Sequence, residues 1–345
     1  MSERVLTSRD LNRALLARQR LLERSREPIP RVLERMGGLQ AQYAPSMYIG
    51  LWSRTEGLER EALTRALERR TVVQGTLLRS TIHLVSRRDW WPFAVAVRDA
   101  RRPWFLRTRR GAVAEADMDR AAARLREHLG DEPMPGKAIV ELVGKELFEG
   151  IGLWVDLVRA PPSGTWERRR ADLFVDAERW VGPCDAEADA SVELLARRYL
   201  AAFGPATAAE FADWAGLPPQ VARAVAERVG TRRFRAEDGA QLLDLPRAPL
   251  PGPDVPAPPR FLPTWDATLL AHARRALIIR EDDRPRIFGT KTPQSFPTFL
   301  VDGQVAGTWR HEDGRTALAP FRSLDAADRR ALEEEGERLA AFHAP

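Results

Sequence analysis

A chain of 345 residues, 44% hydrophobic and 30% charged, has the composition of a water-soluble globular protein and is long enough for two or three domains. No apolar run approaches the roughly 20 residues that a membrane-spanning helix needs, and the start MSERVLTSRD lacks an apolar signal core. The single cysteine, Cys184, excludes an intrachain disulfide and a cysteine-rich metal site, so we expect a reducing, cytoplasmic environment.

The charge balance is basic. The net charge is +5 and the isoelectric point is about 9.9, and three of the 54 basic residues are lysines (Lys137, Lys145 and Lys291), which leaves 51 arginines. A GC-rich genome, and surface arginines that lie beside Asp or Glu, account for part of this excess. The basic character still favours a polyanionic partner.

The first unit, residues 1–110, has the order of elements of a winged helix, in which helices are followed by a hairpin. The helical patterns are SRDLNRALLARQRLL, for which Ser8 is the expected N-cap, then PIPRVLERMGG and EREALTRALERR. The apolar and β-branched run TVVQGTLLRSTIHLVS follows and is broken at Gly75, which predicts a hairpin turn there.

The same order returns in residues 111–185 and, most clearly, in residues 186–246. In the third unit, TAAEFADWAGLPPQVARAVAERV has helix-turn-helix spacing, with Gly216 at the turn. The stretch TRRFRAEDGAQLLDL then predicts two short strands joined at Asp238-Gly239. Three units of similar order indicate tandem winged helices.

A proline-rich linker, residues 247–260, separates these units from a C-terminal module, residues 261–345, and is expected to be extended and semi-rigid. The module contains a strong hairpin signal, TFLV and QVAGTW joined by Asp302-Gly303, and a final amphipathic helix from Leu324 to His343. The predicted fold class is therefore α+β and mainly helical, with tandem winged-helix domains and a hairpin-bearing C-terminal module.

The sequence lacks the familiar catalytic motifs HExxH, P-loop and GxSxG, and it lacks a Cys–His pairing. The five histidines are scattered, so neither a metal nor another cofactor is expected. His83 lies in RSTIHLV, where alternation places Arg79, Thr81 and His83 on one face of a strand. Two interpretations of His83 stay open: a strand histidine bonded to a neighbour, and a residue that faces a substrate.

The stretch GGLQAQYAP, residues 37–45, places two glutamines one residue apart between a helix and an apolar run. In an extended chain Gln40 and Gln42 share a face, whereas in a helix they diverge by about 200°. Gly37 and Gly38 end the preceding helix, so an extended or turn conformation is expected, in which both amides can aim at one point. The alternative is that they cap a helix end or bridge to a neighbouring backbone group.

Together with RSTIHLVSRRDW and FLPTWDATLL, which follow it in order, GGLQAQYAPSMYIGLWSR resembles the AlkZ/YcaQ superfamily of winged-helix DNA glycosylases over nearly the whole chain. Gln40-Ala41-Gln42 resembles the signature of the AlkZ-like branch, because the YcaQ-like branch carries Asp at the last position. The resemblance implies a C-shaped stack of winged helices around the duplex and excision of alkylated bases, especially N7-substituted purines, some formed by antibiotics. It also implies a C-terminal hairpin, here at Asp302-Gly303, that contacts the DNA groove beside the lesion.

The chemistry of a glutamine pair agrees with such a substrate. Glutamine does not titrate, so Gln40 and Gln42 cannot serve as the acid and base of an ordinary glycosidase. An N7-alkylated purine is already cationic, and its departure needs no protonation. The two catalytic amides would then hold a water and place carbonyl dipoles near an oxocarbenium-like sugar, each contributing about 3–4 kcal/mol.

Side chains of the first hairpin and of the C-terminal hairpin are predicted to contact DNA: Arg79, Thr81, His83, Lys291, Gln304 and Arg310. Two groups of arginines in the other hairpins are further candidates for phosphate contacts: Arg168, Arg169 and Arg170, and Arg232, Arg233 and Arg235. No lysine lies near the glutamines in the sequence to form a Schiff base. We therefore expect a monofunctional, monomeric hydrolase that acts on alkylated purines in double-stranded DNA.

Two other classes of function stay open. The repeated winged helices and the high isoelectric point also fit a non-catalytic transcriptional regulator, in which the glutamines would have no catalytic role. A structural adaptor, whose wings pack on another protein, would show no salt-dependent binding to duplex DNA.

Overall fold

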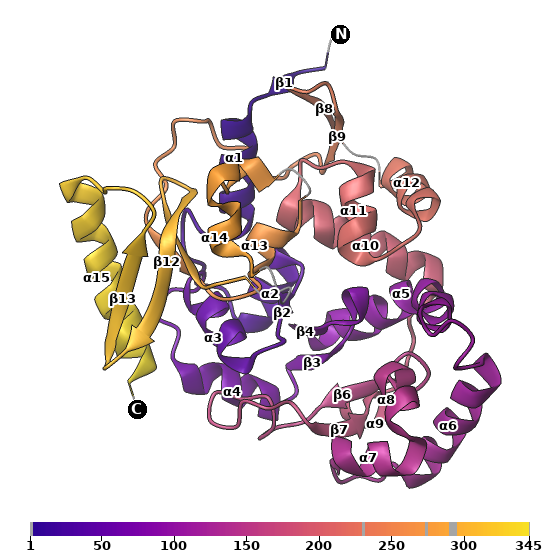
Figure 1. Cartoon of the computed structure of the whole chain (residues 1–345). Coiled ribbons are helices and arrows are strands. Elements are labelled where there is room, and N and C mark those ends of the chain that lie inside the picture. Colours follow the sequence, from indigo (N-terminus) through magenta and orange to yellow (C-terminus); the bar gives the residue numbers. More distant parts are fainter. Residues whose placement is uncertain (1–2, 230–231, 273–274, 290–294, 345) are drawn as a thin grey trace.

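The computed structural model describes residues 3–229, 232–272, 275–289 and 295–344, and these residues form helices and three sheets (Figure 1). Within these ranges, no helix is both long enough and apolar enough to cross a membrane. The mixture of helices and sheets agrees with the predicted fold class. The tandem winged-helix interpretation and the domain boundaries stay predictions.

Residues 3–110 form helices followed by a pair of antiparallel strands, in the predicted order. The elements are α1 (Ser8–Arg18), α2 (Ile29–Met36), β2 (Leu39–Gln40), α3 (Ala44–Trp52), α4 (Arg60–Glu68), β3 (Val72–Thr76), β4 (Ile82–Ser86) and α5 (Arg87–Thr108). The N-cap of α1 is Thr7 and not Ser8, because the Thr7 side chain accepts the Asp10 backbone N–H in a capping box. Gly37 ends α2 in the left-handed conformation (φ 73°), as the sequence predicts.

The predicted turn at Gly75 is wrong. Gly75 lies inside β3, where it pairs with His83 of β4, and the chain reverses around a short 3₁₀ helix (Leu78–Ser80). A Cβ atom at residue 75 would lie 2.2 Å from the ring of Trp90, a buried residue of α5. The glycine therefore permits α5 to pack closely on the sheet, which a local pattern does not reveal.

Residues 111–185 continue the sheet of the first unit. The elements are α6 (Glu115–His128), β5 (Met134–Pro135), α7 (Gly136–Val143), α8 (Lys145–Ile151), β6 (Leu157–Arg159), β7 (Leu173–Asp176) and α9 (Ala177–Val181). Strand β6 pairs antiparallel with β3, so both units share a six-stranded sheet of order β2-β4-β3-β6-β7-β5. Helices α6, α7 and α8 lie at one end of the molecule (Figure 1).

Residues 186–229 and 232–246 contain three helices followed by an antiparallel pair of strands. The elements are α10 (Ala188–Phe203), α11 (Ala208–Ala215), α12 (Pro219–Arg228), β8 (Arg232–Ala236) and β9 (Gln241–Asp244). Gly216 has a positive φ (73°) at the turn between α11 and α12, as predicted. Strand β1 (Val5–Leu6) adds to these two strands, parallel to β8.

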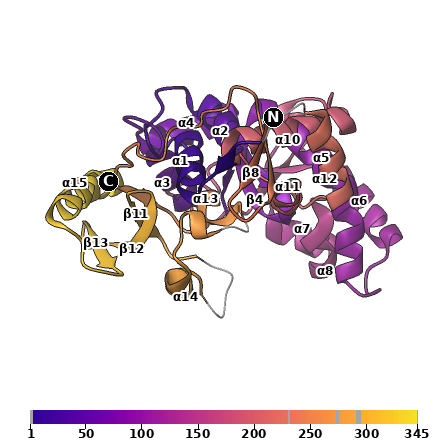
Figure 2. The same ribbon diagram turned by 90° about the horizontal axis from the view of Figure 1, so that it is seen from above.

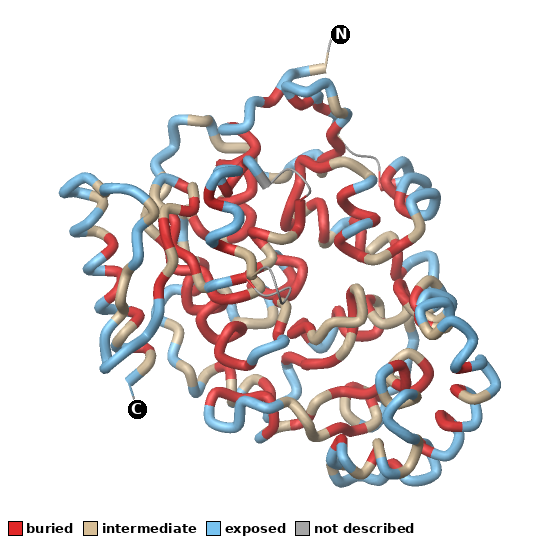
Figure 3. The backbone as a smooth tube through the Cα atoms, viewed as in Figure 1, coloured by how far each residue is buried: buried red, intermediate tan, exposed pale blue. Residues whose placement is uncertain are grey.

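The first and third units share one hydrophobic core. Trp90 of α5 and Tyr199 of α10 both belong to it, and both are buried. Arg18 of α1 forms an ion pair with Asp244 of β9 at 2.7 Å, and both side chains are completely buried. Figure 3 shows this buried centre, with exposed segments along α6, α7 and α15 at the two ends.

The proline-rich segment after β9 runs along α1. Three arginines of α1 donate hydrogen bonds to its carbonyl oxygens: Arg18 to Pro249, Arg9 to Pro253 and Arg13 to Val255. The Val255 backbone N–H donates to the Gly252 carbonyl oxygen at 3.3 Å, whereas the carbonyl groups of Pro249, Pro253 and Val255 are bound by the arginines, which hold the linker against the helix.

The C-terminal module is built on an antiparallel sheet of order β10-β11-β12-β13. Its elements are β10 (Arg260–Leu262), α13 (Ala267–Leu270), two 3₁₀ helices (Arg275–Leu277 and Glu281–Asp283), α14 (Arg284–Ile287), β11 (Thr298–Val301), β12 (Gln304–Glu312), β13 (Arg315–Pro320) and α15 (Ala326–His343). Figure 2 shows β12, β13 and α14 projecting on one side of the helical body.

Candidate active site

Gln40 ends β2, an edge strand that pairs antiparallel with β4, and Ala41 and Gln42 follow it. Gln40 is opposite His83 in the ladder, and the Ala41 backbone N–H donates to the Ile82 carbonyl oxygen at 2.7 Å. Ala41 is buried, whereas Gln40 is half-buried and Gln42 is exposed. Gln40 lies beside β4 through the backbone ladder, and Gln42 lies beside it through its side chain.

The amide of Gln42 is oriented by the backbone of β4. Its Oε1 accepts the Ile82 backbone N–H at 2.9 Å, so this glutamine does bridge to a neighbouring backbone group. The bond fixes the amide plane and leaves a second lone pair on the oxygen, besides two N–H donors, for other partners. Among the described residues, none forms a hydrogen bond with the Gln40 side chain.

His83 is buried and neutral. Its Nδ1 lies 3.0 Å from the Thr81 carbonyl oxygen, which requires a hydrogen on Nδ1 and leaves Nε2 as an acceptor. Burial, with the nearby charge of Arg79, lowers the pKa of His83 to about 3. A neutral, buried imidazole cannot form an ion pair with a phosphate, so the structure favours the interpretation as a strand histidine bonded to its neighbour.

The loop before β4 is held by contacts within the protein. The Arg79 guanidinium donates to the Trp214 carbonyl oxygen of α11, and burial lowers the pKa of Arg79. Arg79 and Ser80 both have positive φ (51° and 58°), which is uncommon for residues other than glycine. Ser80 Oγ accepts from Arg101 Nη2 at 3.0 Å, and Thr81 Oγ1 donates to a carbonyl oxygen of the same loop at 3.1 Å. These contacts favour a positioning role for Arg79 and Thr81 over direct contact with DNA.

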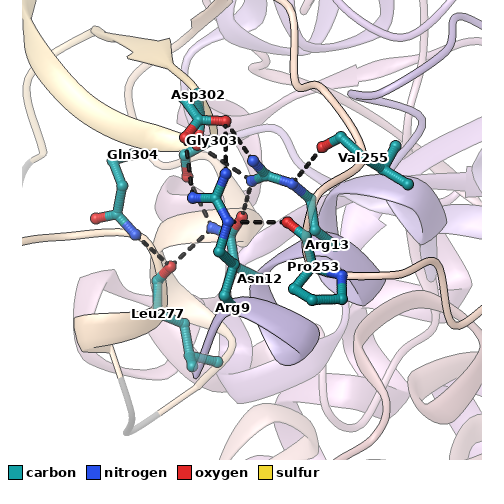
Figure 4. A network of polar contacts seen from close by, with 9 residues as sticks. All are labelled: Arg9, Asn12, Arg13, Pro253, Val255, Leu277, Asp302, Gly303 and Gln304. Atoms are coloured by element: carbon teal, nitrogen blue, oxygen red, sulfur yellow. Dashed lines mark hydrogen bonds and ion pairs between the residues drawn. The ribbon is translucent and has the colours of Figure 1, made fainter. Parts of the chain in front are cut away.

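The predicted hairpin at Asp302-Gly303 is present, but its tip packs on α1 (Figure 4). The Asp302 carboxylate pairs with Arg9 at 2.9 Å and with the fully buried Arg13. Asn12 Nδ2 donates to the Gly303 carbonyl oxygen at 2.8 Å. The amide of Gln304 donates to the Leu277 carbonyl oxygen at 2.8 Å (Figure 4). The partners of this hairpin tip therefore lie within the protein.

The next turn of the same sheet, between β12 and β13, has an exposed tip at Asp313-Gly314. Arg310 of β12 is also exposed, and its guanidinium pairs with Glu312 at 2.7 Å. The third residue predicted in this module, Lys291, lies outside the described residues. The structure thus separates Arg310, which faces solvent, from Gln304, which faces the protein.

The two arginine groups are partly neutralised. Four of the six pair with carboxylates: Arg168 and Arg170 with Asp172, Arg232 with Asp244, and Arg235 with Glu3. Within the described part of the chain, Arg169 and Arg233 have no such partner. Arg169 Nη1 instead donates to the Tyr43 hydroxyl at 3.0 Å, and Tyr43 directly follows Gln42. Arg169 is therefore a cation close to the glutamine motif.

The sequence did not predict a cleft of about 850 Å³ whose wall includes Tyr43, the residue after Gln42. Its aromatic lining includes Tyr43, Trp166 and Phe296, which come from three distant segments of the chain. Tyr43 adjoins the motif and was within reach of sequence reasoning. No local sequence pattern connects Trp166 or Phe296 to the glutamine motif.

The family model described as DNA glycosylase AlkZ-like matches residues 33–342 of this chain. A search of curated proteins finds no match. Among solved structures, the Streptomyces sahachiroi DNA glycosylase AlkZ is similar, with a TM-score of 0.81 and 17% sequence identity over 99% of this chain and 98% of that chain. At this identity the structural likeness shows a common fold, and the family match covers most of the sequence. The chain belongs to the AlkZ-like family of DNA glycosylases.

Proposed function

We propose that this protein is a monofunctional DNA glycosylase that hydrolyses the N-glycosidic bond of N7-alkylated purines in double-stranded DNA. The observation that carries the proposal is that Gln40, the last residue of β2, and Gln42, two residues further along the chain, both lie beside the start of β4, where the Gln42 amide is oriented by the Ile82 N–H. Neither side chain exchanges a proton at neutral pH, so the pair suits a leaving group that departs without protonation.

In the proposed reaction the alkyl group on N7 makes the purine cationic. The bond between C1′ and N9 breaks with its electron pair going to the base, which becomes neutral, and the sugar acquires oxocarbenium character. The amide oxygens stabilise this positive charge and hold the water that adds to C1′, and the proton of that water passes to solvent. Two amide dipoles, at about 3–4 kcal/mol each, suffice for a weakened bond but not for an intact nucleoside.

Hydrolysis by water, rather than through a Schiff base, is supported by the position of two lysines. Lys137 and Lys145 lie on α7 and α8, at the end of the molecule away from β2 (Figure 1). Treatment of a reacting mixture with borohydride is therefore expected to trap no covalent complex between protein and DNA. A trapped complex would refute the monofunctional part of the proposal.

A base-release assay tests the proposal directly. A duplex with a single N7-methylguanine is incubated with the protein and heated in alkali, which cleaves the strand at abasic sites. We expect strand breaks with the wild type and a decrease on the order of 100-fold for Gln40→Ala and for Gln42→Ala. Gln241→Ala, which removes an exposed glutamine from β9, is the matched control.

Two outcomes would contradict the proposal. Absence of strand breaks over a panel of N7-guanine and N3-adenine adducts, both methyl and bulky, would refute glycosylase activity. Full activity of the double variant lacking both glutamines would refute their catalytic role.

A further inference from the structure

The cleft beside the glutamine motif lies between α3, the strands β12 and β13, and the end of α15. Its volume of about 850 Å³ is large enough for a group the size of a nucleotide. Tyr43 forms part of its wall and directly follows Gln42 in the chain. Neither glutamine lines the cleft, so it is distinct from the proposed site of base release and is connected to it through Tyr43.

Aromatic rings line the cleft at two depths. Trp166 and Trp309 are buried, and the Trp309 indole N–H donates to a carbonyl oxygen of β10 at 3.0 Å. Phe296 and Tyr43 are 47% and 40% exposed, respectively. Of the three aromatic side chains that are this exposed among the described residues, two line this cleft and the third is Trp104 on α5. Two solvent-exposed rings in one concavity offer stacking surfaces for a planar partner.

The rim of the cleft is positive. Arg169, Arg286 and Arg310 line it, and none of its described lining residues is Asp or Glu. Arg310 pairs with Glu312, and Arg286 lies 3.7 Å from Asp283, both carboxylates being outside the lining. Arg169 has no carboxylate partner among the described residues, so its charge is available to an anion.

Two stacked histidines complete the wall of the cleft. The rings of His311 and His343 lie 4.2 Å apart at an angle of 23°. Burial, together with the neighbouring His311 and two arginines, lowers the pKa of His343 to about 4. Near neutral pH the His343 ring is therefore a neutral, flat surface.

We propose that this cleft is a second DNA subsite, which receives one unstacked nucleotide of the damaged duplex. Its base stacks against Phe296 and Tyr43, and its phosphate contacts Arg169. Aromatic rings combined with arginines are the chemistry that binds single-stranded nucleic acid, because every base has a flat face and every nucleotide has a charge. The inference rests on the proposed function, since it needs damaged DNA at β2. The aromatic part of a bulky N7 adduct would offer similar chemistry, and the experiment separates the two.

The experiment compares the full-length wild type with Phe296→Ala and Arg169→Ala. Trp104→Ala, which removes an equally exposed ring outside the cleft, is the matched control. Binding to single-stranded oligothymidylate is expected to weaken about tenfold in each cleft variant and to stay unchanged in the control. All three positions are exposed, and thermal unfolding checks that each variant is folded. Equal binding by all four proteins would overturn the inference.

Photocrosslinking then locates the nucleotide. A duplex that carries 4-thiothymidine next to N7-methylguanine is irradiated in complex with the protein. We expect crosslinks to peptides that contain Tyr43 or Phe296. Crosslinks only to other surfaces would overturn the inference. The inference would also be overturned if Phe296→Ala released a naphthylmethyl adduct slowly but N7-methylguanine at the normal rate. The cleft would then hold the aromatic ring of the adduct and not an unstacked nucleotide. A wild type that crosslinks in the cleft without releasing base would refute the proposed function and leave the subsite supported.

Discussion

Burial of neutral His83 predicts that the protein loses stability as the pH falls below about 6.5. The pKa of His83 is about 3 in the folded protein, whereas an unfolded chain restores the ordinary value near 6.5. Between these values the unfolded state binds a proton that the folded state does not, so the free energy of unfolding decreases with falling pH. From pH 7.5 to pH 5.0 the loss from His83 alone is about 2 kcal/mol, and it approaches about 5 kcal/mol below pH 3.

Urea unfolding at pH 7.5 and pH 5.0 measures this loss. In His83→Asn the side chain keeps an N–H donor for the Thr81 carbonyl oxygen but does not titrate, so its pH-dependent loss is expected to be about 2 kcal/mol smaller than that of the wild type. His128→Asn, which removes an exposed histidine from α6, controls for the loss of one histidine. Equal losses in wild type and His83→Asn would refute the reasoning. His343, whose pKa is about 4, acts in the same direction in both proteins.

Three further changes have defined outcomes. Gly75→Ala places a methyl group 2.2 Å from a tryptophan ring, so the free energy of unfolding, measured with urea, should decrease by about 1–3 kcal/mol. Gly130→Ala, where the added methyl group would have no atom within 4 Å, is the control. Arg18→Met leaves the buried carboxylate of Asp244 with only the longer ion pair to Arg232, at 3.6 Å, and should lower the free energy of unfolding by about 3 kcal/mol; replacing both Arg18 and Asp244 by apolar residues should recover most of this loss. The dissociation constant for duplex DNA, followed by fluorescence anisotropy, should rise linearly with salt on logarithmic axes, and Arg169→Ala should reduce the slope by about one.

Local patterns predicted the features that depend on a few neighbouring residues. The left-handed end of α2 at Gly37, the turn at Gly216 and the hairpin at Asp302-Gly303 all need a positive φ, which glycine adopts without a steric penalty. The extended conformation at Gln40 followed from the same logic, because two glycines end the helix before it.

Features that depend on contacts between distant segments could not be predicted from local sequence patterns. The residues around Gly75 are compatible with both a turn and a strand. The contact between Gly75 and the ring of Trp90, which shows why a glycine is needed in the strand, is not visible in the local sequence. Alternation placed Arg79 on a DNA-facing strand, but its partner is a carbonyl oxygen of α11. Gln304 follows a correctly predicted turn, yet the direction of its amide is set by Leu277.

Strand β1 has a consequence for how the chain is made. Val5 and Leu6 pair with Arg235 and Ala236, and Leu6 packs in a small apolar cluster with Phe234. During synthesis, β1 lacks the neighbour it needs until the chain has been extended as far as β8. Closing so long a loop is entropically unfavourable and slow, so β1 should acquire protease resistance only after β8 has been synthesised.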